Sequence, residues 1–250
     1  GAMADEVLPA EGPLQAGVDE EKVMSLVDHL AELRSRLIKI GLAVVAGSAV
    51  GFLLAERIIE ILVAPLPDRQ VRVLGPGDAF VIYLRVAVVV GVVLAMPVIL
   101  YQVWAFVAPG LTPEERRIVR PWVPLALFCF ALGVGVAYII LPFAMQFLLS
   151  FTGGPLRGDL AAGPYFDFVT TLFLAFGLVM EFPILLYGLS RVGIVSSARL
   201  RRSRRYVILG IAIFAAAVTP GGDLVSPTVL GLTMYVLYEA TAFFIARSGH

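Results

Sequence analysis

Charged residues are scarce in this chain of 250 residues. Asp, Glu, Lys and Arg together make up 15% of the sequence, whereas hydrophobic residues make up 59%. Ordinary soluble domains have about a quarter of their residues charged. The mean hydropathy of +0.91 therefore nearly excludes an ordinary soluble enzyme, and it excludes disordered and collagen-like chains as well. The composition is typical of a polytopic helical membrane protein.

Cysteine, histidine and catalytic motifs are nearly missing. The chain has one cysteine, Cys129, and two histidines, His29 and His250. A disulfide within the chain and a cysteine metal cluster are therefore excluded. The sequence also lacks HExxH, GxSxG and P-loop motifs. We expect no enzymatic activity, no metal, no cofactor, no use of ATP by this chain and no nucleic-acid partner.

Long uncharged runs are what the sequence has instead. A helix needs about 20 apolar residues to cross the hydrocarbon core of a bilayer. Because the runs are continuous rather than alternating, membrane β-strands are excluded. We predict an all-α membrane protein with six spans, at residues 40–55, 86–107, 122–141, 168–190, 206–219 and 228–245. We predict that the third span ends near Pro142, because the uncharged run there is too long for one span. The last two spans are short, so we expect these two to thin the membrane or not to cross it fully.

The distribution of positive charge predicts the orientation. Six spans place both termini on one side, and 14 of the 19 Lys and Arg residues fall on that side, against 5 on the other. The positive-inside rule then makes both termini cytoplasmic. We expect residues 1–23, which are acidic and rich in Pro, Gly and Ala, to be a disordered extension, with Gly1 and Ala2 as a cloning remnant and no cleavable signal peptide. Residues 24–246 form the membrane domain, and 247–250 a short cytoplasmic tail.

Small residues in the first span form a GxxxG pattern, at Gly47 and Gly51. This pattern lets a neighbouring helix approach closely. Glycine is common in this chain, so chance and close packing explain the pattern about equally well.

Two cytoplasmic segments carry conspicuous polar residues. Residues 24–37 show an apolar helical face, with Glu32 and Arg36 spaced to pair. This segment is either an interfacial helix leading into the first span or part of a binding surface. Thr112, Pro113 and Glu115 fit the first positions of a helix, so Glu115 is either a capping carboxylate or an acidic site for a basic ligand.

A glutamate lies within the fourth predicted span. Glu181 is costly there, so it should face a protein interior or a wet cavity, or be protonated. Glu239, near the cytoplasmic end of the last span, is expected to snorkel or to pair with an arginine. An intramembrane glutamate leaves open a proton-coupled secondary transporter as an alternative function.

These residues resemble the TatC family, the largest subunit of the twin-arginine protein translocase. The resemblance rests on segments that occur in the family's order, namely HLAELRSRL (29–37), PVILYQVWAFVAPGL (97–111), EERR (114–117), FGLVMEFP (176–183), TPGGD (219–223) and LYE (237–239). It implies a concave, glove-like bundle of a bacterial plasma membrane that binds signal peptides bearing an Arg-Arg pair. It also implies an oligomeric complex with single-span TatA/TatB-type subunits, which exports folded proteins using the proton gradient.

The resemblance also implies particular site residues. The signal-peptide site would comprise Glu32, Leu33, Arg34, Phe106, Glu115, Arg116 and Arg117. The family's intramembrane glutamate corresponds to Glu181, and its contact with partner subunits to Thr219, Pro220 and Asp223. Pro227 stands where many members have a polar residue, a departure from the family's pattern. Carboxylates such as Glu32 and Glu115 are the natural complement of a guanidinium pair.

Overall fold

The computed structural model describes residues 14–67, 70–153, 159–191, 193, 195–219 and 222–247. Throughout these ranges the regular structure is helical, and an isolated bridge pairs Arg72 with Ala161. The elements in chain order are α1 (Leu14–Val63), α2 (Asp78–Val107), the short 3-10 helix η1 (Ala108–Gly110), α3 (Pro113–Val119), α4 (Trp122–Leu149), α5 (Ala162–Val179), α6 (Phe182–Arg191), α7 (Ser197–Val218) and α8 (Val225–Arg247).

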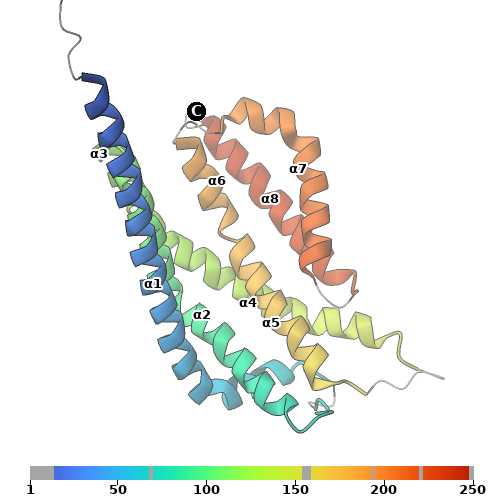
Figure 1. Ribbon diagram of the computed structural model, residues 1–250. Coiled ribbons are helices and arrows are strands. Elements are labelled where there is room, and N and C mark those ends of the chain that lie inside the picture. The colour runs from blue at the N-terminus through green and yellow to red at the C-terminus, as the bar shows by residue number, and fades with distance from the viewer. Residues whose placement is uncertain are drawn as a thin grey trace, which may run out of the picture.

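Helix α1 is far longer than the first predicted span. It runs for 50 residues without a break, because no proline occurs between Pro13 and Pro65. It begins at Leu14, so residues 14–23 are helical, although disorder was expected there. At 1.5 Å per residue α1 is about 75 Å long, against about 30 Å for the hydrocarbon core. Since residues 24–37 continue the axis of the span (Figure 1), they project from it and do not lie flat as an interfacial helix.

Small residues bring α1 and α2 into close contact. A β-carbon placed on Gly47 would lie 2.6 Å from the carbonyl oxygen of Gly91, and one on Gly51 would lie 2.5 Å from that of Ala87. Neither position has room for a side chain, because the obstacle is backbone. The close-packing interpretation of the GxxxG pattern is therefore confirmed, and α2 is the main neighbour of α1 (Figure 1).

The predicted break at Pro142 is wrong, because α4 continues through it to Leu149. The neighbours Leu141, Ala144 and Met145 are all buried, so packing in the core outweighs the hydrogen bond that the proline removes. The chain breaks instead between α5 and α6, at Met180 and Glu181. Pro183 then lies in the first turn of α6, where a missing N–H costs little.

Within the described residues, five helical stretches are long and apolar enough to cross a membrane. They are Val27–Val63, Asp78–Gly110, Trp122–Leu149, Ala162–Arg191 and Val225–Arg247. An all-helical membrane protein is thus confirmed. Helix α7 covers the fifth predicted span, but its first half is rich in arginine and leaves only a short apolar part from Tyr206 onward. The end of α7 and the start of α8 lie well above the lower ends of α2 and α5 (Figure 1).

Two groups of buried side chains hold the helices together. The larger one joins α2, α4 and α5 with the end of α1 and parts of α7 and α8, and includes Val86, Leu141 and Phe176. The smaller one joins α6, α7 and α8 through residues such as Leu186 and Tyr238. The beginning of α1, all of α3 and the end of α8 lie at one end of the molecule, here called the α3 end (Figure 1).

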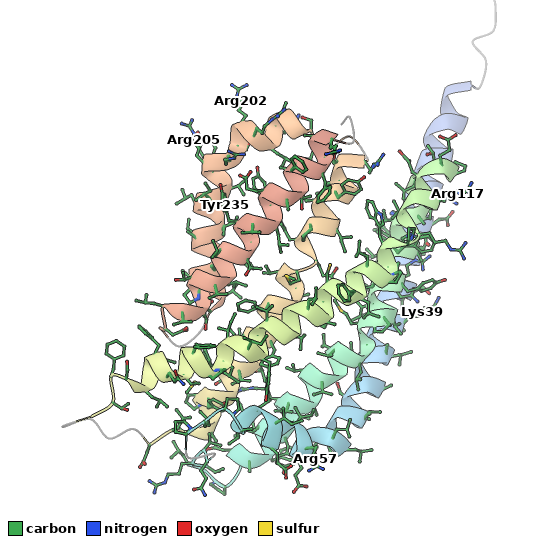
Figure 2. The ribbon with its side chains drawn as sticks, turned by 180° about the vertical axis from the view of Figure 1, so that it is seen from behind. Lys39, Arg57, Arg117, Arg202, Arg205 and Tyr235 are labelled. Atoms are coloured by element: carbon green, nitrogen blue, oxygen red, sulfur yellow. The ribbon has the colours of Figure 1, made fainter. Side chains whose placement is uncertain are left out.

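Side chains mark the two ends differently. Arg117, Arg202 and Arg205 lie toward the α3 end, whereas Arg57 lies at the opposite end (Figure 2). Contacts at that opposite end join α1 and the segment after it to α5 and the segment before it. Arg72 pairs with Asp159 at 2.6 Å, and the Tyr165 hydroxyl donates to the carbonyl of Leu62 at 2.5 Å.

Candidate functional site

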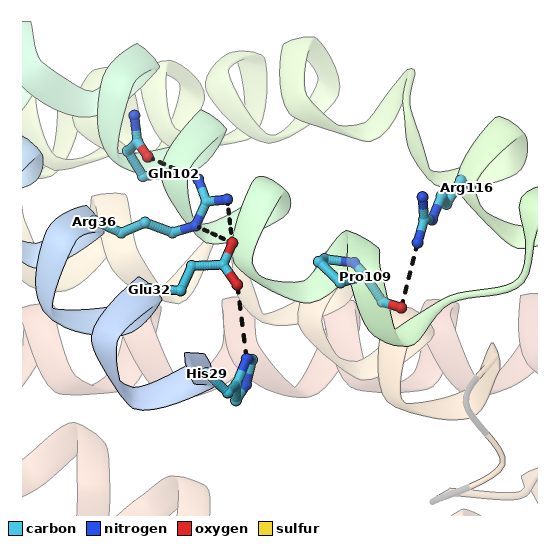
Figure 3. Close-up of polar contacts among 6 residues, drawn as sticks. All are labelled: His29, Glu32, Arg36, Gln102, Pro109 and Arg116. Carbon is cyan, nitrogen blue, oxygen red and sulfur yellow. Dashed lines mark hydrogen bonds and ion pairs between the residues drawn. The ribbon is translucent and has the colours of Figure 1, made fainter. Parts of the chain in front are cut away.

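A polar corner forms where α1 meets α2 at the α3 end. The guanidinium of Arg36 donates from Nε (3.0 Å) and from Nη2 (2.5 Å) to Oε1 of Glu32, one turn earlier on α1. Its Nη1 donates to the side-chain oxygen of Gln102 on α2 at 3.0 Å (Figure 3). Gln102 is buried, and the contact gives its amide oxygen a partner. Arg36 therefore bridges the two helices and orients the carboxylate.

Stacking adds a second link in the same corner. The rings of His29 and Phe106 lie parallel, with centroids 4.4 Å apart. Nδ1 of His29 also lies 3.8 Å from Oε2 of Glu32, the oxygen that Arg36 does not use (Figure 3). Glu32 and Phe106, two of the predicted site residues, are thus brought together from positions 74 apart in the sequence.

Glu115 caps a short helix in the next loop. Its carboxylate accepts the backbone N–H of Thr112 at 2.8 Å, while the Thr112 hydroxyl accepts the backbone N–H of Glu115 at 3.4 Å. This is the reciprocal capping box expected from the Thr-Pro-Glu-Glu sequence. The hydrogen bonds from Thr112, backbone first, lower the pKa of Glu115, and the positive charge of Arg191 adds to the effect. Glu115 is therefore ionised at neutral pH, and its capping role is confirmed.

The remaining predicted residues of this site differ in what they contact. Arg116 donates to the carbonyl oxygens of Leu111 (3.2 Å) and Pro109 (3.3 Å), so it braces the loop before α3 (Figure 3). Leu33 is half-buried, and Arg34 is exposed. Arg117 is exposed and lies toward the α3 end of the molecule (Figure 2).

The spacing of Glu32 and Arg36 predicted their ion pair, but the predicted signal-peptide site did not include Arg36, Gln102 or His29. A signal for Gln102 was available, because it is a polar residue within an uncharged apolar run. Its partner could not be known, since the contact joins residues 66 positions apart.

Glu181 occupies the break between α5 and α6. Its N–H donates to the carbonyl of Leu178 at 3.1 Å, and its own carbonyl accepts from Leu185 at 3.1 Å. Its Oε1 is buried and has no hydrogen-bond partner. A nearby pocket of about 270 Å³ is lined by Pro183 and Ile184 but not by Glu181. The carboxylate thus sits at a helix end, with one oxygen unsatisfied.

Residues of the predicted partner contact lie at the turn between α7 and α8. The Thr219 hydroxyl donates to the carbonyl of Ala215 at 2.7 Å. Asp223 is only 4% exposed, and its Oδ2 accepts the N–H of Ser226 at 2.6 Å, which caps the start of α8. Pro220 lies outside the described residues. A contact of this turn with a partner stays a prediction.

The other predicted charge pair is present. Arg204 of α7 donates from Nη2 to Oε2 of Glu239 on α8 at 2.7 Å. The expectation that Glu239 pairs with an arginine is confirmed. No group of three His, Cys, Asp or Glu side chains suited to a metal occurs in the part of the chain that the structure describes.

Comparison with known proteins identifies the family. Residues 28–232 match the family described as Sec-independent protein translocase protein (TatC). The chain belongs to the TatC family. A TatC protein of Azotobacter chroococcum is 38% identical over 243 residues, which cover 95% of each chain. One of Carboxydothermus hydrogenoformans is 34% identical over 227 residues, or 90% of this chain and 93% of the relative.

A solved structure of the TatC family supports the fold. The crystal structure described as Twin Arginine Translocase Receptor-TatC is 34% identical and superposes with a TM-score of 0.78, covering 89% of this chain and all of that one. The resemblance inferred from the motifs is confirmed. The chain is a membrane-embedded subunit of the twin-arginine translocase and not an enzyme, and this assignment favours protein transport over a small-solute transporter.

Proposed function

We propose that this chain is the receptor of the translocase, which binds Arg-Arg signal peptides at the α3 end of the molecule. In this proposal it spans the bacterial plasma membrane six times, with both termini and the α3 end in the cytoplasm. It assembles with single-span TatA/TatB-type subunits, and the proton gradient drives export of folded cargo.

The observation that carries the proposal is the Glu32 carboxylate, which already holds a guanidinium. Arg36 uses Oε1, with Nη2 at 2.5 Å, and leaves Oε2 facing His29. A carboxylate accepts several charge-assisted hydrogen bonds, so an incoming arginine has an oriented oxygen to bind. The intramolecular pair supports the proposal, because it places a guanidinium against this carboxylate.

Glu115 supplies a second carboxylate for the second arginine. The Thr112 N–H engages its Oε2 and fixes the side chain. Its lowered pKa keeps the negative charge available throughout the physiological pH range. Arg116 holds the same loop in place. The site in this proposal also includes Leu33, Arg34 and Arg117.

Apolar side chains at the α3 end suit the uncharged part of a signal peptide. Phe106 is half-buried against His29, and Leu30 and Leu37 of α1 are 65% and 57% exposed. These leucines lie one heptad apart and therefore on one face of the helix, on the opposite side of α1 from Glu32. The partner-subunit site is assigned to Thr219, Pro220 and Asp223 at the shallow turn between α7 and α8.

The test is direct binding of a fluorescent twin-arginine peptide to the purified chain. Glu32→Gln and Glu115→Gln are each expected to weaken binding roughly tenfold, the usual effect of losing one hydrogen bond to a charged group. Asp159→Asn is the matched control, because it also removes a carboxylate paired with an arginine, at the opposite end of the molecule. Unchanged affinity in both glutamine variants would refute the proposal.

A further inference from the structure

A pocket rich in arginine lies where α2, α3 and α4 meet. It is an open pocket of about 560 Å³, lined by Tyr101, Trp104, Arg116, Arg117, Arg120 and Val123. Three arginines and two aromatic rings therefore surround one cavity, and none of the described residues that line it is acidic.

The positive charge in this pocket is largely uncompensated. Among the described residues, neither Arg117 nor Arg120 forms an ion pair, and Glu114, one turn before Arg117, makes none with it. Arg116 is held by carbonyl oxygens rather than by a carboxylate. Clustered like charges repel one another, so the pocket is suited to an anion.

The position of the pocket along the spans indicates the kind of anion. Tyr101 lies six residues before Val107, the end of α2, which places it about 9 Å deeper along the helix axis. Val123 lies in the first turn of α4. The floor of the pocket is thus made of residues within membrane-spanning helices, and the arginines of and after α3 lie above it. Tyrosine and tryptophan are the residues that favour the headgroup level.

We propose that this pocket binds the phosphate headgroup of an anionic phospholipid. Arg117 and Arg120 would contact the phosphate oxygens, and Tyr101 and Trp104 the glycerol and upper acyl chain. Arginine is well suited to phosphate because its donors are planar and always charged. A bound lipid would anchor the loop that carries Glu115. The inference does not rest on peptide binding, since lipid binding is measured by itself.

The test uses the full-length chain purified in neutral detergent, with bound lipid counted by native mass spectrometry. The wild type is expected to bind phosphatidylglycerol and not phosphatidylcholine. Arg117→Gln and Arg120→Gln should each weaken phosphatidylglycerol binding ~5-fold, and the double variant roughly 25-fold. Arg202→Gln is the matched control, because Arg202 is an exposed arginine toward the same end that does not line the pocket (Figure 2).

Three outcomes would overturn the proposal. The first is unchanged phosphatidylglycerol binding in both single variants, and the second is equal loss in Arg202→Gln. The third is displacement of the lipid by excess inorganic phosphate, which would make the pocket a site for soluble anions. Thermal unfolding of each variant separates loss of the site from loss of the fold.

Discussion

Two glutamates of this chain, Glu32 and Glu181, lie in opposite electrostatic situations. Glu32 is one-third exposed and is held by Arg36, which is held in turn by Gln102. Glu181 lies at the break between α5 and α6, with a buried oxygen that has no partner. The first carboxylate has its hydrogen-bond partners within the chain, whereas the second has one oxygen without a partner.

The difference follows from where each residue lies along its helix. Glu32 is on the part of α1 that projects beyond the apolar run, so water and an arginine one turn away are available. Glu181 lies between helices whose membrane-spanning parts offer no lysine or arginine, since none occurs in 168–190 or 206–245. Water is the least costly partner that remains for Glu181, and we propose that this part of the chain faces a wet concavity.

Reversing the Glu32–Arg36 pair should have the largest effect. Glu32→Arg places like charge before the incoming peptide and beside Arg36, so peptide binding should fall by roughly 100-fold or more. The double variant Glu32→Arg/Arg36→Glu restores the internal pair, and its thermal stability should return to that of the wild type. Peptide binding should not recover fully, because the carboxylate has moved one turn along α1. Full recovery of binding would show that the position of Glu32 is unimportant.

Changing Glu181 should have an intermediate effect, on transport rather than on peptide binding. Glu181→Ala should leave the fold intact and reduce export roughly tenfold, whereas Glu181→Gln should be milder because the amide retains hydrogen bonding. A cysteine introduced at 181 in a Cys129→Ala background should react with a membrane-impermeant thiol reagent. Full export by Glu181→Ala, together with no labelling from either side, would leave Glu181 a purely structural residue.

Weakening the Glu115 cap should have the smallest effect. Thr112→Ala removes the side-chain cap and should destabilise α3 by about 1 kcal/mol. Because the pKa of Glu115 is lowered in the folded chain, its contribution is present at neutral pH and is lost as the pH falls through that lowered value. The protection factors of α3 amides, which correct for the fall of the intrinsic exchange rate with pH, should therefore decrease at acidic pH in the wild type. They should decrease less in Glu115→Gln, which has no charge to lose.

Local features of the sequence were more predictable than long-range ones. The Thr112–Glu115 cap was predictable because both partners lie within one helical turn. The contact of Gly47 with α2 followed from a pattern of small residues, although the pattern does not identify the partner. The contact between Arg36 and Gln102 depends on how α1 and α2 are aligned, which no local rule predicts.

Proline illustrates how tertiary packing overrides local preference. Pro142 and Pro183 look alike as helix breakers, yet α4 continues through the first, while the chain breaks just before the second. Tightly buried neighbours keep α4 helical around Pro142, and the polar Glu181 accompanies the break before Pro183. The start of α1 was also predicted too late in the sequence. The acidic composition before residue 24 suggested disorder, but no proline follows Pro13 there, and the helix begins at Leu14.

The length of α1 has a mechanical consequence. Residues 14–39 extend about 39 Å beyond the apolar run as part of one uninterrupted helix, so they move with it as a rigid lever. The tight contact around Gly47 and Gly51 acts as the fulcrum. A tilt of about 10° at that contact displaces the tip at Leu14, about 52 Å away along the helix, by roughly 9 Å. A force applied to the projecting end that carries Glu32 thus reaches the middle of the membrane along one continuous helix.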